Sequence, residues 1–321
     1  MANFGRFQEV DVGKFIEGNE NKNTLVKTLS NLKLLNEFLT SKYSNETRPI
    51  HCIPACDLDN YLASFIVSVR TKDHKEYEPS TQRGMIGSFD RHLRKRNYGI
   101  SIIGGSVEFS KTRDALKAKQ HDLKGQGKGS KPLRADPLND NDIDKLYECG
   151  QLGNMNPSSI INNLWYQNTL HFGMRGGAME HRAMSWGDVV LKHDTELNYL
   201  QYHERLTKTR NGDDIRSTRL CPPRMYATPQ QPDRCPVQLF MFYQAKRPEG
   251  YSNKDDPFYL ATVTHDKHPR VQDQWFLKGP IGKNKLSNIM KTMAKEAELD
   301  LPKKRLTNTS VRKTRPKDDR Q

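Results

Sequence analysis

Apolar residues in the first part of the chain recur every three or four positions, which is the spacing that places them on one face of an α-helix. The clearest run has leucines at positions 25, 29, 32 and 35, with Asn23 or Thr24 as its cap. Residues 24–123 are therefore predicted to form a small bundle of four helices. Residues 1–23 are polar and weakly periodic, which predicts a flexible N-terminus. The other three helices are expected to begin at Asp57 or Asp59, at Pro79 and at Ser110.

Residues 124–137 read KGQGKGSKPLRADP and have no apolar periodicity. Glycine and lysine dominate the stretch and proline closes it, which is typical of a linker. The sequence therefore predicts two domains joined by a basic connection.

Residues 138–314 mix helical spacing with short alternating runs, and they form the larger predicted domain. Helices are expected from Asn139 or Asp140, from Asn156–Pro157, from Cys235–Pro236 and over 282–297. Strands are expected at 189–191, 197–204 and 215–220, with a short buried strand at 258–260. The fold class is thus mainly α with a small antiparallel β-sheet, and 315–321 is a basic tail.

The distribution of positive charge indicates a polyanionic partner. The chain carries 52 Lys/Arg against 38 Asp/Glu, a net charge of +14. Residues 91–134 hold twelve basic and three acidic residues (+9), and residues 303–321 hold eight and two (+6). Cations gathered in two places favour double-stranded DNA, because neutralised phosphates release condensed counterions. The alternative is that these basic residues only form solvated helix faces and bind no partner. The candidate DNA-binding residues are Arg91, Arg94, Lys95, Arg96, Lys111, Lys117, Lys124, Lys128, Lys131 and Arg210.

Other classes of function find little support. No apolar run approaches the length of a membrane span, and residues 1–12 lack the pattern of a signal peptide. The five cysteines are scattered, which fits a reducing compartment. The stretch HCIPAC, from His51 to Cys56, lacks a matching second pair of ligands. We therefore expect no metal, no cofactor and no membrane partner, and we expect the nucleus as the location.

The stretch 169–188, TLHFGMRGGAMEHRAMSWGD, is the most informative part of the chain. An apolar helix breaks at Gly173, and Arg175 follows at the break. Gly176 and Gly177 permit a sharp turn. An arginine at such a helix end can grip two phosphate oxygens in fork geometry. Taken alone, the stretch favours a surface arginine beside a structural turn over a phosphate site. Trp186 is expected to be a core anchor.

Two later blocks extend this pattern. Residues 198–217 predict a hairpin whose tip, TKTRNG, carries Lys208, and residues 306–314, LTNTSVRKT, carry Arg312. Arg, Lys and Arg in this order resemble the catalytic half of tyrosine recombinases. The amino-acid sequence of these blocks is more similar to that of the Crypton-derived recombinase-like domain (DUF3504-type), which also occurs in zinc finger MYM-type proteins. That domain has similar FGxRG, HR, WGD, ERxTKTRxG and N-H-S-x-R-K-T blocks.

The resemblance implies a helical SAM-like core-binding domain at 24–123 followed by a tyrosine-recombinase-like catalytic domain at 138–314. Arg175 and Arg312 would stabilise charge on the phosphate oxygens, and Lys208 would be the general acid. Threonine occupies position 309, where the family pattern has histidine, so Thr309 cannot act as a cation. Glu180 follows Arg175 by five residues rather than the common three, which leaves its role open.

The family also places a nucleophilic tyrosine after the second arginine, and Lys313–Gln321 contains none. The sequence as written is therefore expected to bind DNA without cleaving it. Two alternatives stay open: an active Crypton-type recombinase with a truncated C-terminus, and a protein-interaction or transcription-regulatory module without a DNA surface. Assembly of several copies on DNA is also open.

Overall fold

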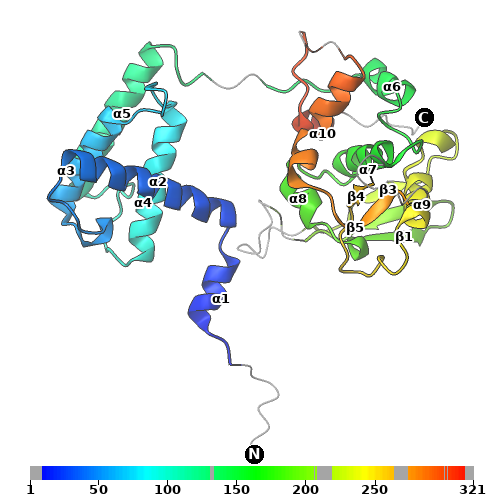
Figure 1. Cartoon of the computed structure of the whole chain (residues 1–321), viewed down its shortest axis with the longest axis horizontal. Helices are drawn as coiled ribbons and strands as arrows, with labels where there is room; N and C mark the ends of the chain where they lie inside the picture. Colours follow the sequence, from blue (N-terminus) through cyan, green and yellow to red (C-terminus); the bar gives the residue numbers. More distant parts are fainter. Residues whose placement is uncertain are drawn as a thin grey trace, which may run out of the picture. The chain divides into compact units, whose positions relative to one another are not determined.

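A computed structural model describes residues 9–130, 134–205, 207, 219–263, 274–299, 301 and 303–314. The chain divides into two compact units, residues 1–132 and 133–321 (Figure 1). The boundary falls inside the expected linker, but less of that segment lies between the units than the sequence suggests. Lys124 is still in a helix, and the Gly129 N–H donates to Glu78 Oε2 at 3.0 Å. On the other side, the Asp136 N–H donates to the Arg305 carbonyl at 3.0 Å.

The first unit is helical over its described length. It contains α1 (Val12–Asn19), α2 (Lys22–Lys42), α3 (Ala55–Ser68), α4 (Pro79–Lys95) and α5 (Ser110–Gly125), with 3₁₀ turns at Ile50–Cys52 and Val107–Phe109. Helices α2 to α5 enclose a core that includes Leu35, Leu58, Phe65, Phe89 and Phe109. Within residues 1–23, for which the sequence predicted a flexible N-terminus and no helix, Val12–Asn19 form α1. Its eight residues are too few to establish a periodic signal among polar neighbours.

Three expected helix caps differ from the observed ones. Helix α3 begins at Ala55 after Pro54, before both Asp57 and Asp59. Asn21, and not Asn23 or Thr24, caps α2, because its Oδ1 accepts from the N–H groups of both of those residues. Asp59 lies inside α3 and binds the start of α5, accepting from Thr112 N–H at 2.7 Å and Lys111 N–H at 3.2 Å. A buried carboxylate thus satisfies N–H groups that Ser110 was expected to cap.

The second unit surrounds one buried helix, α7 (Pro157–His171), in which every residue from 159 to 169 is buried. Around it lie α6 (Asp140–Glu148), α8 (Ala178–Ala183), α9 (Pro236–Lys246), α10 (Lys283–Glu296) and α11 (Asn308–Lys313), with 3₁₀ turns at Trp186–Asp188 and Pro232–Arg234. Trp186 stacks on Phe240 with ring centroids 4.9 Å apart, and the Arg247 guanidinium lies 4.2 Å from the Trp186 ring. The prediction that Trp186 is a core anchor is confirmed.

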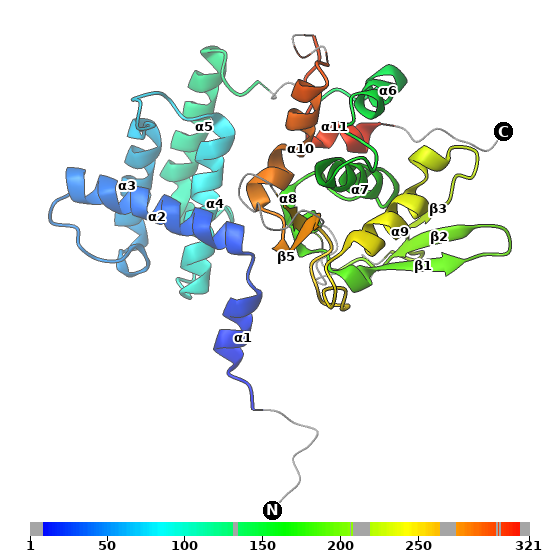
Figure 2. The ribbon, with the colours of Figure 1, turned by 45° about the vertical axis from the view of Figure 1, so that its right-hand side comes forward.

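Two small antiparallel sheets complete this unit, where the sequence predicted one. Strands β1 (Val189–His193), β2 (Asn198–Tyr202) and β3 (Arg224–Tyr226) form the first, and α9 packs against it (Figure 2). Strands β4 (Leu260–Thr262) and β5 (Phe276–Pro280) form the second. The hairpin expected at 198–217 has its second strand at β3, later than predicted, and most of the connection between β2 and β3 lies outside the described residues.

Within the described ranges, no helix combines the length and the apolarity that crossing a bilayer requires. The same ranges contain no group of three or more His, Cys, Asp or Glu side chains arranged to hold a metal ion. In particular, Cys52 and Cys56 are exposed free thiols.

Candidate functional site

Arg175 lies in the turn between α7 and α8 and is oriented by Glu180. The chain leaves α7 at Gly173, whose φ of +66° favours glycine over other residues. The Glu180 carboxylate accepts the Arg175 backbone N–H at 2.7 Å and lies 3.5 Å from its Nε. One third of the Arg175 side chain remains exposed. Glu180, whose role the sequence left open, therefore fixes both the backbone and the guanidinium of Arg175.

The next residue, Gly176, makes the closest backbone approach in this region. A Cβ atom added to Gly176 would lie 2.2 Å from the carbonyl oxygen of Asn308, which is far inside van der Waals contact. Only glycine fits at this position. The Arg175 turn is thereby pressed against the first residue of α11, the helix that carries Arg312.

The side-chain amide of Asn308 joins three segments. Its Nδ2 donates to the Gly176 carbonyl at 2.7 Å and to the Leu286 carbonyl at 2.8 Å, and its Oδ1 accepts the Met290 N–H at 3.1 Å. Leu286 and Met290 are four residues apart in α10, so these are groups that an α-helix would pair with each other. Asn308 thus fastens the Arg175 turn to α10 and α11 together (Figure 2).

Helix α11 presents two of the expected site residues to solvent. Thr309 and Arg312 are exposed, whereas Ser310 and Val311 between them are fully buried. Thr307 caps the helix, accepting from Thr309 N–H at 3.3 Å. Among the residues that the structure describes, none forms an ion pair with Arg312. The structure therefore brings the backbone segments of Arg175 and Arg312 into contact and leaves the Arg312 guanidinium available.

Lys208 and Arg210 lie outside the described residues, but the described residues at both ends of the connection that contains them form hydrogen bonds to this unit. On one side, Arg205 Nε donates to Asp188 Oδ1 at 2.7 Å, in the WGD block. On the other side, Arg219 donates to the Phe172 carbonyl at 3.2 Å, three residues before Arg175. The blocks that carry the family resemblance are thus linked by direct hydrogen bonds.

A buried polar network lies beneath the Arg175 turn. The His181 ring has Nε2 at 3.2 Å from Thr169 Oγ1 and Nδ1 at 3.0 Å from the Tyr259 hydroxyl, which also accepts from Asn168 Nδ2 at 2.7 Å. Burial away from water lowers the pKa of His181 to about 3. His181 is therefore neutral and structural, and it ties α8 to α7 and to the chain just before β4.

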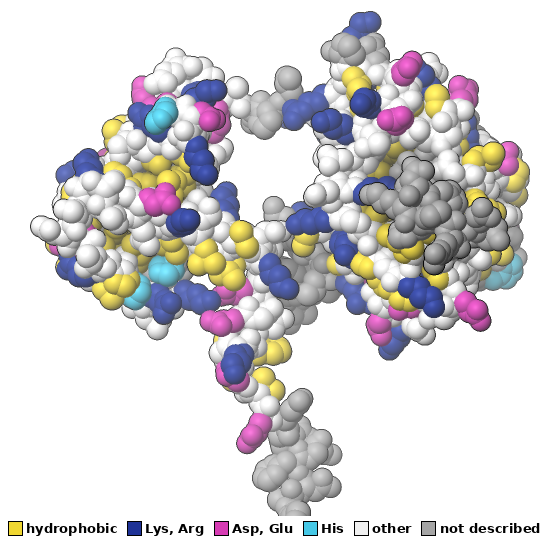
Figure 3. All heavy atoms as spheres, in the orientation of Figure 1, with side chains coloured by type: hydrophobic (Ala, Val, Ile, Leu, Met, Phe, Trp, Pro, Cys, Tyr) yellow, Lys and Arg dark blue, Asp and Glu magenta, His cyan; other side chains and the backbone are white. Residues whose placement is uncertain are grey.

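The candidate DNA-binding residues of the first unit are less available than their number suggests. Arg94 pairs with Asp90 at 3.0 Å, and Lys95 pairs with Glu20 at 2.9 Å. Figure 3 shows basic and acidic side chains interspersed on the visible face of this unit. Other candidates bind uncharged groups: Arg91 donates to Ser88, Lys111 to Asn60 and Lys128 to the Glu76 carbonyl. Arg96, Lys117 and Lys124 are exposed, and Lys131 lies outside the described residues.

The roles of three residues in this region were not identified from the sequence. Glu180 is the partner of Arg175, Gly176 is where the Arg175 turn contacts α11, and Asn308 joins that turn to α10; the three hydrogen bonds of the Asn308 side chain are called the Asn308 clamp below. The double glycine signals the close approach in general terms. Asn308 is the first residue of the block that resembles N-H-S-x-R-K-T, but nothing in the sequence signals its bonds, because its partners are backbone groups at positions 176, 286 and 290.

Comparison with known proteins finds relatives for much of the chain. Residues 140–295 match the family model described as a domain of unknown function, DUF3504. Uncharacterized protein KIAA1958 of Homo sapiens is 24% identical over 251 residues, which cover 77% of this chain and 34% of that protein. Zinc finger MYM-type protein 3 of Homo sapiens is 23% identical over 225 residues, covering 64% of this chain and 16% of that protein.

A third relative, transcriptional regulator QRICH1 of Homo sapiens, is 27% identical over 160 residues, covering 45% of this chain and 19% of that protein. The chain therefore spans about a third or less of the length of each of these relatives. The DUF3504 match includes the Arg175 turn and nearly all of α10, and it ends before α11.

The Gly176 contact yields a first prediction. Gly176→Ala should destabilise the second unit by about 1–3 kcal/mol, because the new methyl group overpacks against the Asn308 backbone. Urea unfolding followed by tryptophan fluorescence reports on this unit, since Trp165, Trp186 and Trp275 all lie in it. Gly177→Ala is the matched control, because a Cβ there meets nothing within 4 Å. Equal stability of the two variants would contradict the close approach.

The buried histidine yields a second prediction. The unfolded chain binds a proton at His181 near pH 6.5, whereas the folded state does so only near its pKa of about 3. The contribution of neutral His181 to the free energy of unfolding is therefore fully present above pH 6.5 and is lost as pH falls toward 3. Between pH 6.5 and 5 the free energy of unfolding should fall by about 1.5 kcal/mol. His181→Gln should flatten this dependence, and His193→Gln, at an exposed position in β1, should retain it. An unchanged slope in His181→Gln would contradict the assignment.

Proposed function

We propose that this DUF3504-containing chain binds double-stranded DNA through the surface of its second unit around Arg175 and α11. In this proposal the second unit is a recombinase-derived catalytic fold, and residues 24–123 are the matching SAM-like core-binding domain. The observation that carries the proposal is the contact between Gly176 and Asn308, which joins the segments of the two arginines.

The chemistry of these side chains suits a phosphodiester. A guanidinium is always charged and offers paired N–H donors to phosphate oxygens. Arg175 is held in place by Glu180 and is still one third exposed, while Arg312 is exposed on α11. The Thr309 hydroxyl lies one helical turn before Arg312 and can add a hydrogen bond. Lys208 would complete the set from the connection between Arg205 and Arg219.

Thr309 favours binding over strand cleavage. A histidine at this position could donate a charged hydrogen bond and shuttle protons near neutral pH, and a threonine hydroxyl can do neither. An active Crypton-type recombinase is the alternative, and it requires a nucleophilic tyrosine as well as Lys208 as general acid. The described residues Arg175, Arg312 and Thr309 support phosphate recognition best, because recognition needs only the two guanidinium groups and the threonine hydroxyl.

The proposed biological role of this DNA binding is regulation of transcription in the nucleus. One relative is named a transcriptional regulator, and a DNA-binding unit without strand cleavage fits such a role. The rival is a protein-interaction module that keeps the fold without a DNA surface. Salt dependence separates the two, because DNA binding releases counterions from the phosphates and weakens steeply as salt rises.

Arginine removal tests the proposal directly. Arg175→Ala and Arg312→Ala should each weaken binding to a fluorescent DNA duplex on the order of tenfold, because each removes charge-assisted hydrogen bonds to phosphate. The slope of log affinity against log salt should also decrease by about one unit. Fluorescence anisotropy over a salt series measures both quantities, and circular dichroism checks the fold.

Lys192→Ala is the control for loss of one positive charge, because Lys192 is exposed on β1, away from the Arg175 turn in the sequence. It should leave the affinity within about twofold of wild type. Affinity that stays flat across salt, or arginine variants that bind like wild type, would reject the DNA-binding role in favour of the protein-interaction module.

A further inference from the structure

Helix α1 carries an apolar face that is largely exposed. Val12, Phe15 and Ile16 follow the i, i+3, i+4 spacing of one helix face, and their exposed fractions are 67%, 63% and 58%. None of the eight residues of α1 is buried. Exposed apolar side chains gathered on one face of a helix are typical of a surface that binds a partner.

The connection to α2 holds α1 away from its own bundle. Glu20 and Asn21 have extended backbone conformations, and Asn21 is fixed as the cap of α2. Lys95, at the end of α4, binds Glu20 at 2.9 Å and lies 3.8 Å from Glu17. Figure 2 shows α1 projecting from the end of α2. The arm, residues 9–20, is therefore directed outward with its apolar face uncovered.

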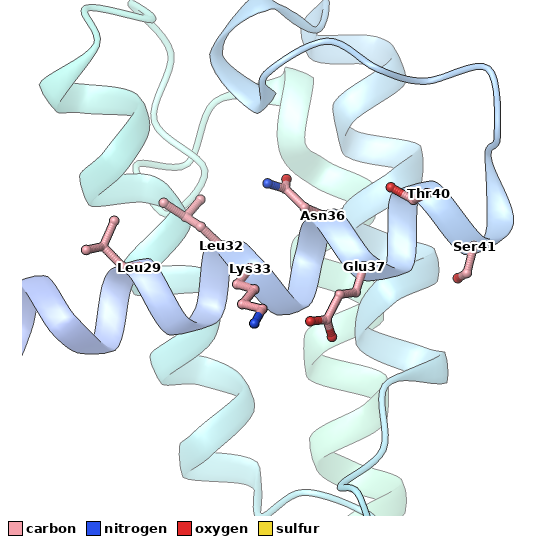
Figure 4. A pocket seen from close by; sticks show the side chains of 7 residues that line it. All are labelled: Leu29, Leu32, Lys33, Asn36, Glu37, Thr40 and Ser41. Carbon is pink, nitrogen blue, oxygen red and sulfur yellow. The ribbon is translucent and has the colours of Figure 1, made fainter.

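Helix α2 carries an exposed apolar stripe beside the face that it buries in the bundle core. Leu25, Val26 and Leu29 are 40%, 65% and 56% exposed. This apolar stripe continues into a shallow groove of about 720 Å³, whose lining side chains stand in a row along α2 in Figure 4. The lining residues are Leu29, Leu32, Lys33, Asn36, Glu37, Thr40 and Ser41.

We propose that the arm of one copy of this chain docks on the α2 stripe of a second copy, and that the exchange is reciprocal. In an antiparallel arrangement, Val12 lies opposite Leu29, Phe15 opposite Val26 and Ile16 opposite Leu25. The intervals along both helices are the same, three residues and then one. The polar side chains of Lys14 and Glu17 lie on the opposite face of α1 and stay in water.

Charge complementarity supports the same pairing. The arm contains four acidic residues and one lysine, a net charge of −3, and α2 contains four lysines and one glutamate, a net charge of +3. Within the arm's own unit, Glu17 and Glu20 pair with Lys95 and Asp11 pairs with Lys14, so Glu9 is the acidic residue of the arm that pairs with no cation among the described residues. When Val12 faces Leu29, Glu9 comes level with Leu32, one residue from Lys33, and Asp11 comes level with Ser30. Lys33 has no ion-pair partner among the described residues. Opposite charges on two surfaces steer association and fix the register.

A second copy is the occupant because the arm of the same chain is held elsewhere. Folding back onto its own α2 would require breaking the extended Glu20–Asn21 connection and the Lys95 ion pairs. Two copies related by a two-fold axis make the same contacts without that change, and each contact then occurs twice in a closed assembly. The inference does not depend on DNA binding.

Disulfide trapping between two different variants tests the exchange. Full-length Val12→Cys is mixed with full-length Leu29→Cys, oxidised and separated without reducing agent. Docking in trans places the new thiols within the distance that a disulfide needs. The mixture should therefore give a covalent species of twice the chain mass. Each variant alone and the wild type measure the background from the four exposed native cysteines.

The matched control replaces Leu29→Cys with Val67→Cys, which is 52% exposed on α3. It should give no covalent dimer above background. Phe15→Ser added to the Val12→Cys chain should abolish the trapped dimer, and the same change in the wild type should halve the mass found by sedimentation. A chain that carries both Val12→Cys and Leu29→Cys is oxidised in parallel. The proposal is overturned if the mixture gives no dimer, or if this double variant forms its disulfide within one chain and remains a monomer.

Discussion

The amide of Asn308 is the interaction on which the second unit's surface depends. Its two polar atoms make three hydrogen bonds to backbone groups of the Arg175 turn and of α10. Each such bond contributes about 0.5–1.5 kcal/mol. The missing side chain at Gly176 is what lets α11 come close enough to form them.

This arrangement separates structural cations from available ones. Arg247 is buried against Trp186, and Arg94 and Lys95 of the first unit are paired with carboxylates. Arg205 and Arg219 hold the ends of the connection that contains Lys208. Arg312 is different, because it is exposed on a helix whose neighbouring residues are buried. A net charge of +14 therefore says less about DNA binding than the position of a few arginines does.

Sequence periodicity predicted the helices that pack against a core, and α2, α3, α4, α5, α7, α9 and α10 occur close to where it placed them. It missed α1, whose apolar face has no partner within its unit, and β5, whose sequence FLKGP mixes apolar residues with glycine and proline. The cap of α5 was misassigned because Asp59 is distant in sequence. Order along the chain predicted that the segments of Arg175 and Arg312 belong together, and their backbones meet at Gly176 and Asn308. Asn308 stood in the family block, but its role could not be recognised, since its bonds go to backbone atoms.

A double-mutant cycle between Arg175 and Arg312 tests the central claim most directly. Affinity for the same DNA duplex is measured for the wild type, Arg175→Ala, Arg312→Ala and the double variant. If the Asn308 clamp makes both guanidinium groups part of one phosphate site, their effects should be non-additive, with a coupling energy of about 0.5–3 kcal/mol. Effects that add to within about 0.3 kcal/mol would show two independent cations and would contradict the account.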